Sequence, residues 1–393
     1  MKILIVCYKY PPAYSGYGKQ LQTIINKMID TNKDIEFEII SGKFPNIEDE
    51  YKERLNIRRM GSKRLTKLHP SLGFYSFALS TFIGVILKKN QADIIHGIKA
   101  GPEAIATILA SKIIKNPVIV KIVENELSDR EIVSANPIKK ALRKIRYPII
   151  TSADKYIAIS KDIKTRLRSR NVPDHKIIAL PNAVDENRFT VAGESEKLSL
   201  RKVNSISTSA TVILFSGSIS KRKGIYDLLK AYDNINMSDE ILLLLCGPMY
   251  ENENYFSDLL ETINKKRSNK KVKYQGSVDN IEDYIKLSDI LVLPSYSEGL
   301  PNVLLEGAIS GKALLASDIS GNNEIIKDGF NGVLFSVGDY NKLTEKLTDL
   351  IIDKDKRLYL AANAQKKAIE SYSLSKITQQ YYDLYETLLQ DFK

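Results

Sequence analysis

The stretch Pro294-Ser-Tyr-Ser-Glu298-Gly-Leu-Pro-Asn302-Val-Leu-Leu-Glu306 is the most informative part of this chain. It follows an apolar run, Ile290–Leu293, that is typical of a buried strand. Pro301 suits the first position of a helix, because its missing N–H would have no partner there. We therefore expect Glu298 in a turn at the carboxyl end of a strand and Glu306 in the following helix. Such turns bind anions, and ligands of doubly wound sheets bind at that edge.

Strand and helix patterns alternate along the whole chain, which favours an α/β fold with two doubly wound, Rossmann-like parallel sheets. Helical periodicity falls between the apolar runs, for example at 101–115 and 161–168. The runs that we interpret as strands are 2–7, 35–41, 93–96, 117–123, 155–159, 176–180, 211–215, 240–246, 272–274, 290–293, 313–316 and 333–335.

The division into domains is predicted from length and composition. A chain of 393 residues suits two or three domains. Residues 193–210 are polar and Ser-rich, so we interpret them as a linker. The predicted parts are an N-terminal domain (1–192), this linker, a C-terminal domain (211–373) and an amphipathic C-terminal helix (374–393) that crosses back to the first domain.

Composition favours a cytosolic globular protein, with 43% hydrophobic and 27% charged residues. The first apolar run is too short for a signal-peptide core, and no stretch reaches the roughly 18 apolar residues of a membrane span.

Residues 1–190 contain 33 Lys and Arg against 19 Asp and Glu, a net charge of +14, whereas the remainder has a net charge of −3. This asymmetry predicts an anionic partner for the N-terminal half, such as a membrane surface, a lipid phosphate or nucleic acid.

Two glycine-containing loops are candidate phosphate sites. Gly217-Ser-Ile-Ser-Lys221-Arg222-Lys223-Gly224 follows a predicted strand and places three cations before a helix. Cations oppose the dipole at a helix start, so the arrangement favours a bound anion over lysines in water. Near the N-terminus, Gly16-Tyr17-Gly18 fits neither the phosphate-loop nor the dinucleotide fingerprint. It is either a tight strand–helix connection or a loop that approaches a diphosphate or acceptor.

The 294–306 stretch resembles the EX7E motif of retaining glycosyltransferases with the GT-B fold, family four. Segments 153–160, 180–189, 274–278 and 328–332 are similar to other family segments, so the resemblance covers essentially the whole chain. It implies two domains facing a central cleft, with a nucleoside-diphosphate sugar as donor. The implied donor-binding residues are Gly16, Gly217, Arg222, Lys223, Val278, Glu298, Gly299, Leu300, Pro301, Asn302, Val303 and Glu306.

The resemblance also implies roles for these residues. Glu306 holds the ribose hydroxyls and Glu298 contacts the donor sugar. Arg222 and Lys223 stabilise the departing diphosphate, with Arg222 standing in for the family's usual Arg, whose position is occupied by Ser218. No metal or other cofactor is then required.

The N-terminal half departs from the family pattern. Family members commonly carry His-x-His where this chain reads His96-Gly-Ile98, so only His96 could contact the transferred sugar as a catalytic residue. A lone His at a strand end is equally a structural residue. Tyr14, His96, Glu124 and Glu126 are the predicted acceptor-binding residues.

The predicted activity is transfer of a sugar, with retention, to a hydroxyl of a glycan, lipid-linked or envelope-polymer acceptor. A sugar-nucleotide epimerase of the same fold and a non-catalytic partner or glycan-binding subunit remain alternatives. Nucleic acid is not a predicted partner.

The pattern at 137–147 predicts an amphipathic basic helix, and a basic run at 58–67 precedes the apolar segment 72–87. We therefore expect peripheral binding to the anionic inner face of the membrane; a helix packed on its own sheet is the alternative for 137–147.

Overall fold

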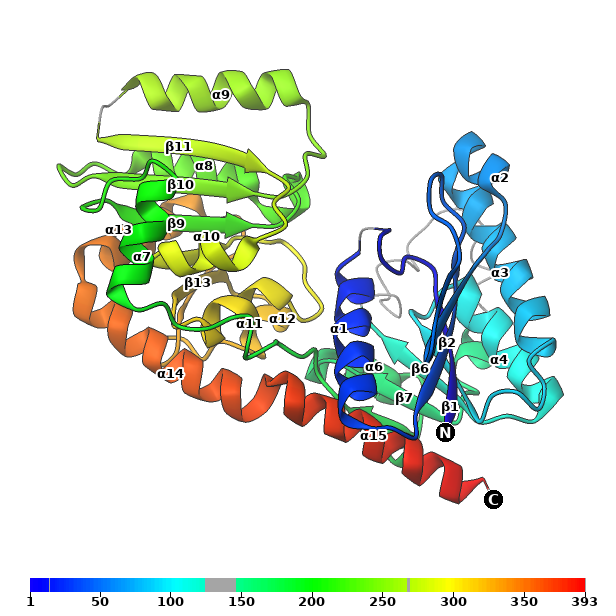
Figure 1. Ribbon diagram of the computed structural model, residues 1–393. Coiled ribbons are helices and arrows are strands. Elements are labelled where there is room, and N and C mark those ends of the chain that lie inside the picture. The colour runs from blue at the N-terminus through cyan, green and yellow to red at the C-terminus, as the bar shows by residue number, and fades with distance from the viewer. Residues whose placement is uncertain (14, 124–145, 267–268, 393) are drawn as a thin grey trace. The chain divides into compact units, whose positions relative to one another are not determined.

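The structure is a computed structural model that describes residues 1–13, 15–123, 146–266 and 269–392. The chain forms two compact units. Unit 1 contains Met1–Ala183 together with Leu374–Lys393, and unit 2 contains Val184–Ser373. Each unit is an α/β domain built on its own sheet (Figure 1).

Unit 1 contains an eight-stranded sheet with the order β3-β4-β2-β1-β5-β6-β7-β8. All neighbours are parallel except β3 and β4. Its centre is buried on both faces, so β1, β5 and β6 are mostly apolar without polar alternation, and the His96 of β5 and the Lys121 of β6 are buried with them. The strands are β1 (Lys2–Cys7), β2 (Glu36–Gly42), β3 (Glu50–Lys52), β4 (Leu55–Met60), β5 (Ile94–Ile98), β6 (Val118–Ile122), β7 (Lys155–Ala158) and β8 (Ile177–Ala179).

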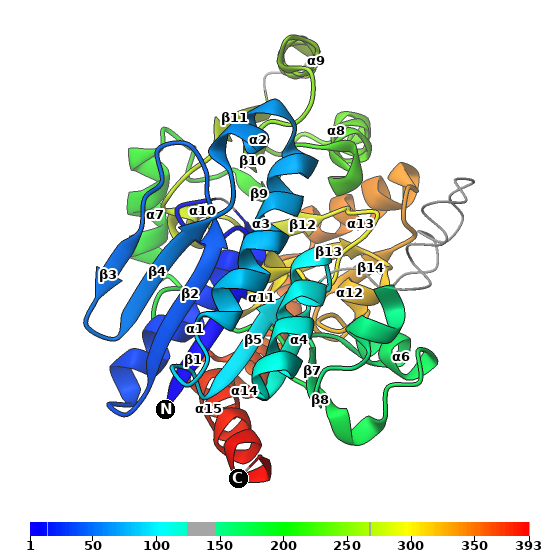
Figure 2. The ribbon, with the colours of Figure 1, turned by 90° about the vertical axis from the view of Figure 1, so that its right-hand side faces the viewer.

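Helices cover both faces of this sheet. Helices α2, α3 and α4 lie on one face, and α1 and α15 pack together on the other (Figures 1 and 2). The helices of unit 1 are α1 (Gly16–Thr31), α2 (Lys63–Leu68), α3 (Pro70–Ile86), α4 (Pro102–Ile114), α6 (Lys161–Ser169), the short η2 (Asp174–Lys176) and α15 (Leu374–Asp391).

Unit 2 contains a six-stranded parallel sheet with the order β11-β10-β9-β12-β13-β14. Its main hydrophobic core lies between the sheet and α8, α9 and α13. The strands are β9 (Thr211–Ser216), β10 (Ile241–Cys246), β11 (Lys270–Gly276), β12 (Ile290–Leu293), β13 (Ala313–Ser317) and β14 (Val333–Phe335). The helices are α7 (Glu194–Val203), the short η3 (Lys221–Lys223), α8 (Ile225–Asn234), α9 (Glu253–Lys266), α10 (Ile281–Leu287), α11 (Asn302–Ile309), α12 (Ser320–Asn323), α13 (Tyr340–Ile352) and α14 (Lys354–Tyr372).

The predicted linker 193–210 is wrong. Residues 194–203 form α7, and the boundary between the units lies at Ala183 and Val184. Arg201 of α7 is buried and its guanidinium contacts the Asp289 carboxylate at 2.7 Å, while Lys197 contacts the same carboxylate at 2.5 Å. These two ion pairs fix a polar segment on unit 2, which composition alone did not reveal.

The predicted strands all occur, with shifted ends at several, but β3 and β4 were not predicted. The basic run at 58–67 includes part of β4, where Arg59 is buried. Its guanidinium donates to the carbonyl oxygens of Tyr10 (3.0 Å) and Pro11 (2.6 Å), so Arg59 supports the loop after β1. Among the helices that the structure describes, none is long and apolar enough to cross a membrane.

Candidate functional site

The two loops singled out in unit 2 lie next to each other because of the strand order. The chain builds β9, β10 and β11 toward one edge and then returns to place β12 beside β9. The carboxyl ends of β9 and β12 therefore form the point at which the strand order reverses, where open α/β sheets bind their ligands. The loop 217–224 leaves β9 and the loop 294–301 leaves β12 at this point.

Backbone contacts join the two loops. The N–H of Tyr296 donates to the Arg222 carbonyl at 2.9 Å. Gly224 has φ +70°, and a Cβ built there would lie 2.0 Å from the Pro294 carbonyl oxygen. Position 224 therefore requires glycine for both its conformation and its contact, and this glycine lets the two loops approach.

Opposite charges meet at this junction. Lys223 Nζ lies 2.5 Å from Glu298 Oε1, and both side chains are largely buried. The Arg222 guanidinium donates to the Ser297 carbonyl at 2.7 Å and lies 3.9 Å from Glu298, with 57% of its side chain exposed. The predicted cations and the first predicted carboxylate thus gather at one place, with the arginine facing solvent.

Helix α11 begins at Asn302, one residue later than the sequence suggested, and Pro301 is its N-terminal cap. Pro301 itself makes no side-chain hydrogen bond to this helix start, and backbone N–H groups at a helix start are groups that bind anions. Glu306 is the fifth residue of α11 and is partly exposed, as are Gly299, Asn302 and Val303, whereas Leu300 and Pro301 are buried. Gly321 of α12 packs against the Glu298 carbonyl. The loop that carries Glu298 therefore contacts α12 as well as the loop 217–224.

Gly217 and Val278 lie at the carboxyl ends of β9 and β11 and are both partly exposed. A Cβ added at Gly217 would lie 3.9 Å from Lys223 Cε, so this glycine adjoins the basic loop. The structure therefore places the predicted donor residues of unit 2 along one sheet edge.

Arg188 is a residue of this region that the sequence analysis did not single out. Its guanidinium contacts Glu282 at 2.7 Å and donates to the Asp279 carbonyl at 3.1 Å. The hydrogen bond with Glu282, and the nearby charge of Glu306, raise the pKa of Arg188. Arg188 is thus anchored to the segment after β11, and the charge of the second glutamate of the motif acts on it. Arg188 lies within segment 180–189, which resembles a family segment, and this resemblance was the sequence signal that could have identified it.

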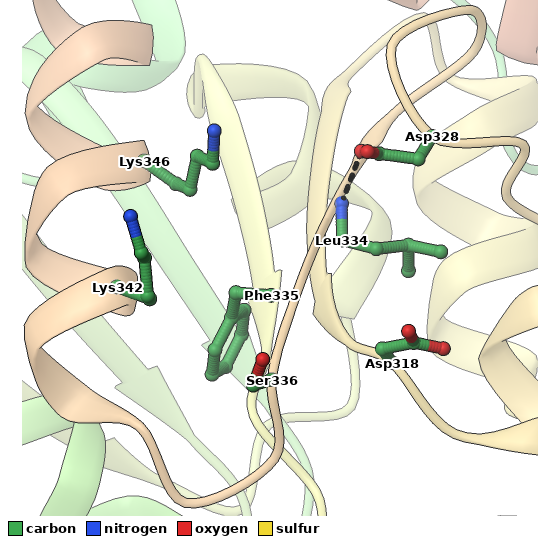
Figure 3. Close-up of a pocket in the computed structure, with 7 residues that line it drawn as sticks. All are labelled: Asp318, Asp328, Leu334, Phe335, Ser336, Lys342 and Lys346. Carbon is green, nitrogen blue, oxygen red and sulfur yellow. Dashed lines mark hydrogen bonds between the residues drawn. The ribbon is translucent and has the colours of Figure 1, made fainter.

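Two other features of unit 2 are separate from these loops. A cavity of about 280 Å³ beside β14 is lined by Asp318, Asp328, Leu334, Phe335, Ser336, Lys342 and Lys346 (Figure 3), and none of these is a predicted donor residue. The sequence contains one Asp-x-Asp triplet, Asp353-Lys-Asp355. Asp353 caps α14 by accepting from the Lys356 N–H, so the triplet belongs to a helix start.

Unit 1 presents a second reversal point, between β1 and β5. Gly16 is the first residue of α1 and is exposed, whereas Gly18 is buried and a Cβ there would lie 2.2 Å from the Lys9 carbonyl oxygen. The glycine that this turn requires sterically is therefore Gly18, for packing within the chain. Lys99, at the end of β5, has φ +78° and its ammonium lies 5.4 Å from the Tyr17 ring centre.

The structure places His96, a predicted catalytic and acceptor-binding residue, in the interior of unit 1. His96 lies within β5 and is fully buried, and its Nδ1 is 2.8 Å from the Tyr385 hydroxyl of α15. Burial, together with the nearby Lys121 ammonium, lowers the pKa of His96 to about 3. The buried ring packs under α15, which favours the structural alternative, and its contact with the transferred sugar stays a prediction.

The other predicted acceptor residues, Tyr14, Glu124 and Glu126, lie outside the described residues. Most of the predicted basic helix 137–147 does too. Arg146 is described, and its guanidinium donates to the Ala100 carbonyl at 2.5 Å, within unit 1. This hydrogen bond ties the Arg146 side chain to the end of the loop after β5.

Comparisons with known proteins agree with this geometry. The family model "Glycosyl transferases group 1" matches residues 196–367, and "Glycosyltransferase Family 4" matches residues 16–188. The chain is 26% identical to N-acetyl-alpha-D-glucosaminyl L-malate synthase of Bacillus anthracis over 84% of this chain and 88% of the relative. It is 27% identical to N,N'-diacetylbacillosaminyl-diphospho-undecaprenol alpha-1,3-N-acetylgalactosaminyltransferase of Campylobacter jejuni, over 93% and 95%.

Among solved structures, Anabaena HepE in complex with UDP and glucose superimposes with a TM-score of 0.77 and 19% identity. The match covers 98% of this chain and 100% of HepE. That likeness shows the fold, which is GT-B. The two family models together extend over both units, one for each. The chain therefore belongs to the family-four, group 1 glycosyltransferases and is a GT-B enzyme of that family.

Proposed function

We propose that the protein transfers a sugar from a nucleoside-diphosphate sugar to a hydroxyl of a lipid-linked or envelope-polymer acceptor, with retention and without a metal ion. The observation that supports this most is the junction of Arg222, Lys223 and Glu298 at the strand reversal of unit 2. It brings two cations and a carboxylate together at the edge where doubly wound sheets bind nucleotides.

The cations neutralise the diphosphate. In the structure Lys223 is engaged by Glu298, and Arg222 by the Ser297 carbonyl. A diphosphate at the start of α11 competes for both cations, with Arg222 supplying planar, two-point geometry. Because these cations are positioned before the reaction, they stabilise the charge that grows on the leaving group at little cost in reorganisation. A metal ion would then be redundant.

The carboxylates orient the rest of the donor. We assign Glu306 to the ribose hydroxyls, with Arg188 and Glu282 fixing the loop next to it. Glu298 contacts the donor sugar, and its release from Lys223 on diphosphate binding leaves it available for sugar hydroxyls. The backbone amides around 300–303 contact sugar and phosphate.

Retention follows if the acceptor attacks from the face that the diphosphate leaves. The bond between the anomeric carbon and the phosphate oxygen breaks, and a bond to the acceptor oxygen forms. The acceptor's proton passes to the departing diphosphate. This route needs no second carboxylate as a nucleophile.

The acceptor is proposed from charge. The two curated relatives act, by their names, on L-malate and on a diphospho-undecaprenol-linked sugar. The +14 net charge of residues 1–190 favours an acceptor at an anionic surface over a small free acid. We therefore place the enzyme at the inner face of the membrane, peripherally bound through unit 1.

A screen of nucleotide sugars without acceptor tests the proposal. The enzyme is expected to release nucleoside diphosphate and free sugar slowly from its cognate donor, and Arg222→Ala is expected to abolish this. An epimerised nucleotide sugar would identify an epimerase instead, an alternative that the relatives' names do not favour. Absence of any turnover across the screen would favour a non-catalytic subunit.

A further inference from the structure

Helix α3 of unit 1 is apolar on both sides. Its inner side packs into the core through Phe77 and Val85, which are fully buried. Its outer side exposes large apolar side chains at intervals of three or four residues, which places them along one stripe of the helix. These are Leu72 (42% exposed), Tyr75 (62%), Leu79 (66%), Ile83 (50%) and Leu87 (69%), the last being the helix's C-terminal cap.

The stripe continues onto the neighbouring helix. Helices α3 and α4 lie side by side on the same face of the sheet (Figures 1 and 2). On α4, Ile113 is 62% exposed. We name Leu72, Tyr75, Leu79, Ile83, Leu87 and Ile113 the apolar ridge. Single exposed apolar side chains are ordinary, but a row of this length marks an interaction surface.

The exposed charged side chains on the helices that carry the ridge are positive. Residues 63–89 include no Asp or Glu. Exposed cations lie at the amino end (Arg64 and Lys67) and at the carboxyl end (Lys89), and Lys112 accompanies Ile113. The one acidic residue of α4, Glu103, is 1% exposed. The ridge is therefore rimmed by positive charge.

The apolar ridge and its positive charges favour an anionic bilayer over a second copy of the chain as the binding partner. In a symmetric dimer through the ridge, the same patch would face itself, so cations at its ends would confront cations. An anionic bilayer complements both features, because apolar side chains enter the interface and Lys and Arg contact lipid phosphates. Helix α3 has 17 residues and is packed along a sheet face, which suits lying in the interface.

We propose that the apolar ridge is the surface by which unit 1 docks on an anionic membrane. The proposal rests on the proposed function, since a lipid-linked acceptor requires the enzyme at a bilayer. It differs from the sequence-based expectation, which centred on the basic helix 137–147. Here the contact is made by α3 and α4, and Arg64 and Lys67 supply the electrostatic attraction.

A fluorescent reporter tests the location directly, because the chain contains no Trp. Leu79→Trp in the full chain is expected to shift its emission to the blue, and to be quenched by brominated lipid, with vesicles containing phosphatidylglycerol. A matched reporter in unit 2, Leu358→Trp at a residue 58% exposed, is expected to show neither change. If vesicles bind the protein but Leu79→Trp stays unquenched, another surface makes the contact and the proposal is wrong.

Sedimentation with vesicles measures the energetics. Leu79→Ser with Ile83→Ser is expected to lower partitioning onto anionic vesicles at least tenfold, and Arg64→Ser with Lys67→Ser to lower it mainly at low salt. The control pair Ile352→Ser and Leu358→Ser should leave it unchanged. Concentration-dependent dimers that the ridge substitutions abolish, without vesicle binding, would identify a second copy as the occupant and overturn the proposal.

The same variants separate this proposal from the proposed function. Ridge variants should hydrolyse the nucleotide sugar at the wild-type rate, because the ridge lies outside the donor site. Loss of vesicle binding with hydrolysis intact supports the ridge. A wild-type protein that binds vesicles through the ridge yet turns over no nucleotide sugar would refute the proposed function alone.

Discussion

The reversal points of the two sheets share a topology but differ in what they carry. In unit 2 the loops after β9 and β12 are joined by backbone contacts, and two cations meet a carboxylate there. In unit 1 the corresponding edge contributes a buried His96, covered by α15, together with Lys99 and Tyr17. A strand-order reversal alone therefore does not create a charged binding site, because the side chains at the reversal point must also supply the charges. The loops at the reversal point of unit 2 are fixed by close backbone packing, whereas the corresponding edge of unit 1 carries a buried histidine.

The largest effect is expected where the unit 2 loops touch. Gly224→Ala would place a Cβ 2.0 Å from the Pro294 carbonyl oxygen, so the loops must separate. The left-handed backbone costs roughly 1–2 kcal/mol and the clash about 1–3 kcal/mol more. We expect loss of nearly all activity and a lower melting temperature, measured by initial rates and thermal unfolding.

Gly329→Ala is the matched control for that substitution. Gly329 also has φ +70°, but no atom of the described residues lies within 4 Å of the point where a Cβ would be. This variant should lose about 1 kcal/mol of stability through strain and keep its activity. Equal activity losses in both variants would contradict the role given to loop contact.

Removal of the exposed cation comes next. Arg222→Ala should lower kcat/KM by about 10²–10³-fold, equivalent to roughly 2.7–4 kcal/mol of transition-state stabilisation. Arg222→Lys keeps the charge but loses the planar geometry, so it should recover only part of the rate. A wild-type rate in Arg222→Ala would remove the leaving-group role from this loop.

The second glutamate should act on binding more than on rate. Glu306→Ala is expected to weaken nucleoside diphosphate binding about 10- to 100-fold, because hydrogen bonds to a charged group contribute roughly 1.5–3 kcal/mol. Isothermal titration measures this, with Glu345→Ala on exposed α13 as the control. Unchanged affinity in the Glu306 variant would make the ribose assignment wrong.

The smallest effect on activity is expected in unit 1. His96→Gln should change kcat/KM by less than about threefold, since the ring is buried. Its effect is on stability: the pKa of His96 falls to about 3 in the folded chain, so the unfolded chain binds the proton first. Stability should fall as pH drops below 6.5, by at most about 1.4 kcal/mol per pH unit, and His96→Gln should lack this dependence in urea unfolding. A large loss of activity at neutral pH would restore a substrate role to His96.

Sequence predicted much of unit 2 because its determinants are local. Apolar runs such as 290–293 became strands with the same bounds, and the spacing of Glu298 and Glu306 located the loop and helix between them. Long-range pairing explains the misses. Segment 194–203 was interpreted as linker because its anchor, Asp289, is distant in sequence. Likewise, Arg59 was interpreted as surface charge because its carbonyl partners at 10 and 11 lie across the sheet.

Single side chains were harder to place than elements. The sequence offered His96 as either structural or functional, and its packing against Tyr385 from the far end of the chain favours the structural role. Arg188 was overlooked because its role depends on Glu282, 94 residues later. The segment 72–87 was recognised from the sequence as apolar, but which of its side chains face outward required the fold.

The most direct test of the central claim measures donor turnover in a chelator. We predict that the wild-type enzyme releases nucleoside diphosphate from its cognate nucleotide sugar at an unchanged rate in EDTA. Proton NMR of the transferred sugar should show the anomeric configuration of the donor. Complete loss of the rate in EDTA with rescue by manganese or magnesium, or a product of inverted configuration, would contradict metal-independent retention by the cations of unit 2.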